Sequence, residues 1–333
     1  MVRIEGIKDF MSLREEQQSD ILRGLKFKER LFSFLENRQS KEVKEKRQVD
    51  CKHCCGSGKI LLEPRNNADI HASQIHLCPR KLWFDLKGYG NKYSQKPAPQ
   101  LQLIFDHGTK LHDMLQEYGM QGAWKSADFT TYLPEAKLLP TREECIEKGV
   151  DFYPLAAKFR IRSSIDAVIK NFVVEDVRGL GTVVIDVIQE IKSISSAGLA
   201  KLDGPKPVHK KQGTLYQAVT NIPICVYMYY GKDDGKGGEG NLKFYAQRFD
   251  GYVWAEVEDK INEVLLMEDE EDPDFAIPIE RTAWTYDKAE CVGTEYNSPC
   301  QYYGTVCKPS DTVEASLVTA RRGRKKKNEL PKD

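Results

Sequence analysis

The sequence predicts a mixed α/β fold in which a central sheet is flanked by helices. Two segments, 158–169 and 182–194, alternate between apolar and polar residues with the period of two that is typical of a strand. Three amphipathic segments, at 71–90, 101–119 and 208–221, have the spacing of helices. Because helices and strands are interspersed along the chain, they favour a sheet with helices packed on its faces.

The composition is that of a globular protein. Among 333 residues, 40% are hydrophobic and 30% are charged, and we favour one elaborated domain over two smaller ones. No run approaches the roughly 18 apolar residues of a membrane span, so no membrane association is expected. The charged N-terminus resembles no signal peptide, which predicts a reducing cytoplasmic compartment.

Three regions are expected along the chain. Residues 1–50 are highly charged with scattered apolar positions, which indicates a helical N-terminal extension. Residues 51–310 hold the predicted sheet and its helices, and residues 311–333 form a basic tail that we expect to be disordered. Six of the seven residues at 321–327 are basic, so the tail either contacts nucleic-acid phosphates or only aids solubility.

Later strands are predicted from shorter signals. The apolar segment 222–230 follows the last predicted helix, and 242–249 follows a glycine-rich connection at 231–240 that is typical of a hairpin. On the strand at 182–194, the period of two places Glu190 and Lys192 on one face.

Polar residues on the two long strands have the chemistry of phosphodiester hydrolysis. That reaction uses carboxylates to hold a divalent cation, and it benefits from a positive group near the phosphate. Glu190 and Lys192 can meet at one phosphate, and Asp166 can supply a second carboxylate. Such a Glu-x-Lys triplet is by itself a weak signal, because many surface strands carry one.

The surrounding residues make the pattern more specific. His112 lies on the helix predicted at 101–119, while Gln212 and Tyr216 are four residues apart and share a helical face. This ordered set, a helical His, an Asp, a Glu-x-Lys and a Gln-x-x-x-Tyr, resembles the nuclease domains of RecB, AddB and the CRISPR-associated RecB-like exonucleases of the PD-(D/E)XK superfamily. The resemblance spans 70–310 and implies a restriction-endonuclease-like core. Ile165 stands where the family's name has proline.

The resemblance also implies a role for each residue of the set. Lys192 would polarise the attacking water or stabilise the phosphate, and Gln212 and Tyr216 would position DNA and the lysine. The ligands of a Mg or Mn ion would be His112, Asp166, Glu190 and the backbone carbonyl of Ile191.

Nine cysteines in a reducing compartment point to metal binding more than to disulfides. Cys78 precedes the predicted nuclease core, and Cys291, Cys300 and Cys307 follow it. This bipartite placement is similar to that of the iron-sulfur RecB-like nucleases, which implies that the four thiolates hold a 4Fe-4S cluster. Eight and six residues separate the last three cysteines, which is wider than in that family. A tetrahedral zinc site on the same residues and unligated thiols are the alternatives.

A second candidate metal site lies at 51–70. The run beginning at Cys51 matches one zinc knuckle, in which Cys51 and Cys54 would bind Zn and the following glycines let amides turn toward the thiolates. A knuckle supplies two ligands, and the residues that could complete the shell are Cys55, His53, His71 and His76. Cys145 and Cys225 are interpreted as ordinary buried thiols.

Together these patterns predict a Mg- or Mn-dependent DNA nuclease. The resemblance implies an exonuclease that processes DNA ends in recombination, repair or replication, with a helicase or a recombinase as a candidate partner. Because acidic and basic residues both number 50, contacts with DNA must come from local patches. The alternatives are a structure-specific endonuclease, a non-catalytic iron-sulfur DNA-binding subunit, and a zinc-dependent regulator that acts through the knuckle.

Overall fold

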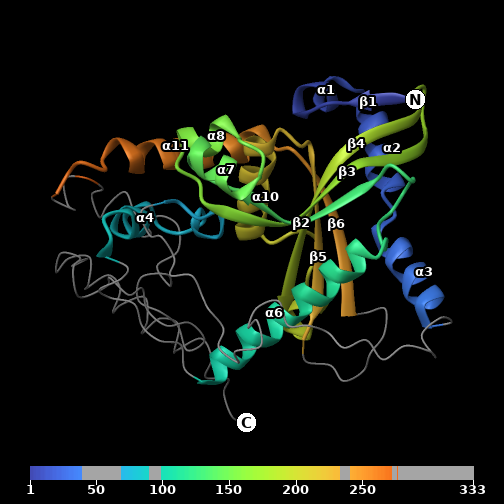
Figure 1. The fold of residues 1–333 in the computed structure, drawn as a ribbon, viewed down its shortest axis with the longest axis horizontal. Helices are drawn as coiled ribbons and strands as arrows, with labels where there is room; N and C mark the ends of the chain where they lie inside the picture. The colour runs from blue at the N-terminus through green and yellow to red at the C-terminus, as the bar shows by residue number, and fades with distance from the viewer. Residues whose placement is uncertain (40–68, 90–98, 233–240, 272–275, 277–333) are drawn as a thin grey trace, which may run out of the picture. The chain divides into compact units, whose positions relative to one another are not determined.

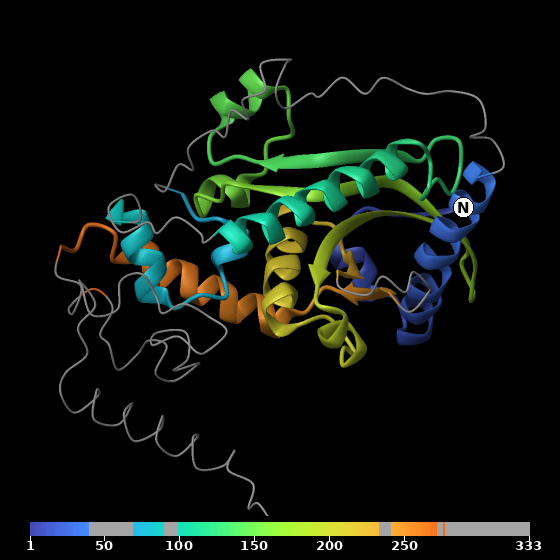
Figure 2. The same cartoon turned by 90° about the horizontal axis from the view of Figure 1, so that it is seen from below.

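The computed structural model describes residues 1–39, 69–89, 99–232, 241–271 and 276 (Figures 1 and 2). The chain divides into two compact units. Unit 1 comprises Met1–Ser73 with Pro97–Val257, and unit 2 comprises Gln74–Lys96 with Glu258–Asp333. No helix within the described ranges is both long and apolar enough to cross a membrane.

A six-stranded mixed sheet forms the centre of unit 1 (Figure 1). Five strands follow one another across it in chain order, and all neighbours are antiparallel except β4 and β5, which are parallel. The sixth, β1, pairs in parallel with the first part of β4. The strands are β1 (Val2–Ile4), β2 (Thr131–Leu138), β3 (Ser163–Val177), β4 (Gly181–Ile194), β5 (Ile224–Gly231) and β6 (Leu242–Arg248). The predicted mixed α/β fold with a central sheet flanked by helices is confirmed.

Two long helices cover opposite faces of this sheet. A side-chain carbon at Gly213 of α10 (Pro207–Thr220) would meet Tyr227, whereas one at Gly108 of α6 (Pro99–Met120) would meet Ser193. Tyr227 of β5 is paired with Glu190 of β4, so the two side chains share a face of the sheet. Ser193 lies three residues after Glu190 on β4, so its side chain points to the opposite face. Helix α6 runs along β2, β3 and β4 (Figure 2). Both helices lie where their apolar periodicity predicted them.

The N-terminal helices complete the core beneath α6. They are α1 (Ile7–Ser12), α2 (Glu15–Gly24) and α3 (Phe27–Gln39), and they agree with the amphipathic pattern of this region. Phe27 stacks on Phe172 of β3, with ring centroids 5.5 Å apart, and lies 6.1 Å from Trp124. Ile21 and Leu31 are buried in the same cluster. The N-terminal segment therefore contributes to the core of unit 1.

The remaining elements are short, apart from one helix that passes from unit 1 into unit 2. The short ones are the 3-10 turn η1 (Ala72–Gln74) and the helices α4 (Pro79–Leu86), α7 (Arg142–Lys148), α8 (Pro154–Lys158) and α9 (Ser196–Ala200). The longer one is α11 (Gly251–Leu266).

Two predicted elements begin later than expected. The helix predicted from residue 71 starts only at Pro79, because proline suits the first helical turn and holds the preceding Cys78 in an extended conformation. The strand predicted from residue 158 starts at Ser163, and before it Ile161 forms a single bridge to Ile70. The alternation of apolar and polar residues at 158–162 therefore did not indicate a strand.

In unit 2, α4 contacts the chain around and beyond the end of α11. The indole nitrogen of Trp83 donates a hydrogen bond to the carbonyl of Met267 at 2.7 Å. Lys260 Nζ donates to the carbonyl of Leu77 at 3.1 Å, next to Cys78. These bonds join segments that are more than 180 residues apart in the sequence.

Candidate active site

Strands β3 and β4 separate at the level of the predicted catalytic residues. Their ladder extends as far as the pair Ala167–Gln189. Beyond it, β3 continues along β2 to Ser163, while β4 continues along β5 to Ile194. The next residues on the two strands are Asp166 and Glu190, so both carboxylates lie where the sheet divides.

The carboxylate of Asp166 bridges this gap. One oxygen accepts the backbone N–H of Ile191 at 2.6 Å, and the other lies 3.3 Å from Nδ1 of His112 on α6. Burial by itself would raise the pKa of Asp166, but the bond with His112 and the charge of Lys192 outweigh it and lower the pKa. Asp166 is therefore held as an anion.

Asp166 in turn raises the pKa of His112. Burial would lower the pKa of His112, but its hydrogen bond and attraction to Asp166 prevail, so the pKa is raised above the ordinary histidine value. The protonated imidazole is thus favoured as the partner of the partly buried carboxylate. It connects α6 to the division of the sheet.

Glu190 and Lys192 lie side by side on β4, as a spacing of two residues requires. Nζ of Lys192 forms an ion pair with Oε1 of Glu190. Glu190 is only 1% exposed, and its other oxygen, Oε2, has no hydrogen-bond partner among the described residues. Burial, with the nearby charge of Asp166, raises the pKa of Glu190 to about 7.

An unpartnered carboxylate oxygen in the interior is unfavourable unless some group binds to it. Within the described residues, no three His, Cys, Asp or Glu side chains are placed so that they could together hold a metal ion. Even so, the donors at the division of the sheet fit a Mg or Mn ion, because both metals prefer carboxylate oxygens and Oε2 of Glu190 is unengaged. Metal binding by His112, Asp166, Glu190 and the Ile191 carbonyl stays a prediction.

Gln212 and Tyr216 lie one turn apart on α10 and are hydrogen-bonded to each other. Gln212 Nε2 donates to the Tyr216 hydroxyl at 3.0 Å, and that hydroxyl donates to the carbonyl of Ser164 at 3.0 Å. Both side chains are buried. The pair therefore connects α10 to β3 two residues before Asp166, and a role in positioning DNA remains a prediction.

Replacing Tyr216 with phenylalanine is expected to lower the free energy of unfolding by about 1 kcal/mol, because it leaves the Ser164 carbonyl and the Gln212 amide without their partner. Urea unfolding followed by circular dichroism measures this. Tyr252→Phe is the control, since Tyr252 is 93% exposed. Equal stability of the two variants would contradict the structural role of the Tyr216 hydroxyl.

Two residues of this region were not identified from the sequence. Gln116, one turn after His112 on α6, donates to a carboxylate oxygen of Glu135 at 2.8 Å and to the backbone carbonyl of Asp166 at 2.9 Å. Gln116 could have been found from its spacing of four residues from His112, which places both side chains on one face of the helix. The sequence analysis gave no signal for Glu135, because it did not predict strand β2.

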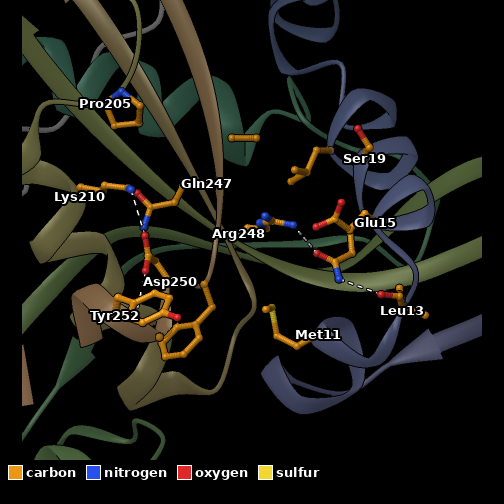
Figure 3. A pocket seen from close by; sticks show the side chains of 15 residues that line it. Met11, Leu13, Glu15, Ser19, Pro205, Lys210, Gln247, Arg248, Asp250 and Tyr252 are labelled. Carbon is orange, nitrogen blue, oxygen red and sulfur yellow. Dashed lines mark hydrogen bonds and ion pairs between the residues drawn. The ribbon is translucent and has the colours of Figure 1, made fainter. Parts of the chain in front are cut away.

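A pocket of about 940 Å³ lies elsewhere in unit 1 (Figure 3). Its walls come from α1, α2, β6 and the beginning of α11. Arg248 donates to Gln18 across it at 3.1 Å, and Lys210 is paired with Asp250 at 3.1 Å. The predicted catalytic residues are not among those that line it.

The cysteine predictions fall mostly outside the described residues. Cys51, Cys54, Cys291, Cys300 and Cys307 all lie there, as does the basic tail. Of the four predicted cluster ligands only Cys78 is described, and it is a buried residue that precedes α4. Cys145 and Cys225 are buried thiols, which confirms their interpretation.

Comparisons with known proteins give only distant similarities. No model of a known protein family matches the sequence, and no curated protein matches it. Among solved structures, the alkaline exonuclease LHK-Exo from Laribacter hongkongensis is 15% identical, with a TM-score of 0.40 over 62% of this chain and 91% of that chain.

The complex of LHK-Exo with dAMP gives a TM-score of 0.39 with the same identity and coverage. The structure of SSO0001 is 17% identical, with a TM-score of 0.35 over 72% of this chain and 86% of that chain.

Proposed function

We propose that this protein is a nuclease that hydrolyses phosphodiester bonds of DNA with Mg or Mn. The observation that carries the proposal is a pair of carboxylates on strands that separate beside Lys192. Glu190 is buried, and Asp166 and Lys192 are partly buried. Glu190 Oε2 has no hydrogen-bond partner among the described residues, so it is available to a cation. Carboxylates that converge with so little exposure to water are costly to stability, and metal binding would account for them.

Each residue contributes a distinct part of the chemistry. When bound, the metal would acidify a water molecule and offset the negative charge of the phosphate. Asp166 is oriented by His112 and by the N–H of Ile191, so its carboxylate is placed before substrate arrives. Lys192 can donate from its ammonium group to a phosphate oxygen or to the attacking water.

The substrate and the mode of cleavage follow from the sequence resemblance. We propose DNA ends, in single strands or frayed duplexes, as the substrate of an exonuclease in recombination, repair or replication. A helicase or recombinase could supply those ends. The rival is a structure-specific endonuclease of the same chemistry.

Purified protein incubated with linear and with closed circular DNA, with Mg, Mn or EDTA, tests the proposal. An exonuclease degrades only the linear DNA and is inactive in EDTA. Cleavage of the circle would favour the endonuclease. Tight DNA binding without cleavage under any metal would favour a non-catalytic DNA-binding subunit.

We also propose that Cys78, Cys291, Cys300 and Cys307 hold a 4Fe-4S cluster. Cys78 is buried beside Leu77, whose carbonyl is bonded to Lys260 of α11. Because α11 precedes the later cysteines in the sequence, this contact supports the proposal.

Cys78→Ser is expected to lose most of the iron and sulfide of anaerobically purified protein, because one of four thiolate ligands is removed. Iron, sulfide and zinc are quantified per chain. Cys145→Ser, which alters a buried thiol in unit 1, should retain the wild-type content. Zinc without iron in the wild type would favour the tetrahedral zinc site, and zinc that survives Cys78→Ser would favour the knuckle at Cys51 and Cys54.

A further inference from the structure

A second carboxylate, Glu135 of β2, is connected to Asp166 through Gln116. Gln116 Nε2 donates to Oε1 of Glu135 at 2.8 Å and to the backbone carbonyl of Asp166 at 2.9 Å. Gln116 is 6% exposed, so this amide is a buried polar group whose bonds matter. Gln116 and His112 therefore hold Asp166 from adjacent turns of α6, one at the backbone and one at the carboxylate.

Glu135 has an uncommon backbone conformation at this point. Its φ is +52°, in the left-handed region that residues with a Cβ rarely adopt. In the register of β2 and β3 it lies between the pairs Pro134–Ala167 and Ala136–Ile165, and so opposite Asp166. Unfavourable conformations of this kind persist where the surrounding contacts require them, and they gather at functional sites.

The bonds of Glu135 connect it to the residues on either side of Asp166. Its Oε1 is occupied by Gln116, while its Oε2 accepts the hydroxyl of Ser164 at 2.5 Å and lies 3.4 Å from Nζ of Lys137. Both oxygens are thus engaged. Oε2 of Glu190, by contrast, has no hydrogen-bond partner within the described part of the chain.

We infer that Gln116 and Glu135 are positioning residues, which fix the backbone of Asp166 so that its carboxylate faces the metal site. The inference rests on the proposed function, since it concerns the same site. Outer residues that orient metal ligands commonly contribute 10- to 100-fold to metal affinity or activity. Here Glu135 orients Gln116, and Gln116 orients Asp166.

Two variants and a matched control test this inference. Gln116→Leu removes both bonds at similar volume, and Glu135→Gly removes the carboxylate while permitting the positive φ. Gln121→Leu is the control, because Gln121 makes the same kind of bond to Glu117 on α6, at 2.7 Å, away from Asp166. Mn affinity is measured by titration calorimetry on the protein without DNA, and kcat and KM are measured on linear DNA.

Both variants are expected to bind Mn about 10- to 100-fold more weakly, with kcat reduced and KM for DNA unchanged, while Gln121→Leu matches the wild type. The double variant should bind Mn no more weakly than the worse single variant, because both substitutions act through Asp166.

Mn affinity equal to that of Gln121→Leu in both variants would overturn the inference. Should Gln116→Leu fail to fold, Glu135→Gly decides, because the Glu135 side chain is 49% exposed. A wild type that neither binds Mn nor cleaves DNA would instead refute the proposed function, and the inference with it.

Discussion

Replacing Lys192 with alanine is expected to reduce metal-dependent DNA cleavage about 1,000-fold, the typical effect of removing one group that stabilises charge in a transition state. Lys192 Nζ is paired with Glu190 at the division of the sheet, where we propose that the ammonium contacts the phosphate. The fold should survive, because Glu190, with its pKa raised to about 7, can take up a proton once its partner is lost. Values of kcat/KM on linear DNA and DNA affinity without metal measure the two effects.

Lys170→Ala is the matched control for this experiment. Lys170 also pairs with a carboxylate, that of Asp186, with its Nζ 3.4 Å from the carboxylate oxygen, but this pair lies away from the candidate active site. Its loss should leave cleavage at the wild-type rate. Wild-type cleavage by Lys192→Ala, or an equal loss in both variants, would show that Lys192 has no specific role.

Gly213→Ala is expected to lower the free energy of unfolding by about 3 kcal/mol, at the upper end of the usual cost of overfilling a core. An alanine Cβ at this position would lie 1.9 Å from the hydroxyl of Tyr227 and 3.1 Å from the sulfur of Cys225. Tyr227 has little freedom to move, because its hydroxyl donates to the carbonyl of His209 or to Gln247. Helix α10 would therefore have to move away from β5.

Thermal and urea unfolding measure this effect, with Gly204→Ala as the control. A Cβ at Gly204 would meet no atom of the structure within 4 Å, so its effect should stay within about 0.5 kcal/mol. Since α10 also carries Gln212 and Tyr216, Gly213→Ala should weaken cleavage as well. Unchanged stability would mean that α10 does not approach β5 as closely as described.

Local periodicity was sufficient to predict the main elements around the site. A period of two placed Glu190 and Lys192 on one face of β4, and helical spacing placed Gln212 and Tyr216 on one turn of α10. Both relations depend only on the dihedral angles of consecutive residues, which is why they can be read from the sequence.

Elements that depend on distant partners were not predicted. Strand β1 is three residues long and exists because it pairs with Val183–Ile185 of β4, about 180 residues away. Strand β2 carries Pro134 and the left-handed Glu135, neither of which is typical of a strand. In both segments the hydrogen bonds to a neighbouring strand outweigh the weak local preference of the residues for strand conformation.

The amino-acid sequence by itself determined which residues carry acid, base and ammonium groups, and which of them share a face of a strand or helix. The tertiary structure decided that β3 and β4 separate at Asp166 and Glu190, that Glu190 is buried with one oxygen unengaged, and that Gln116 holds the backbone of Asp166. The physical reason is that side-chain direction follows from local backbone geometry, whereas strand register and the loss of water from a carboxylate depend on segments far apart in the chain.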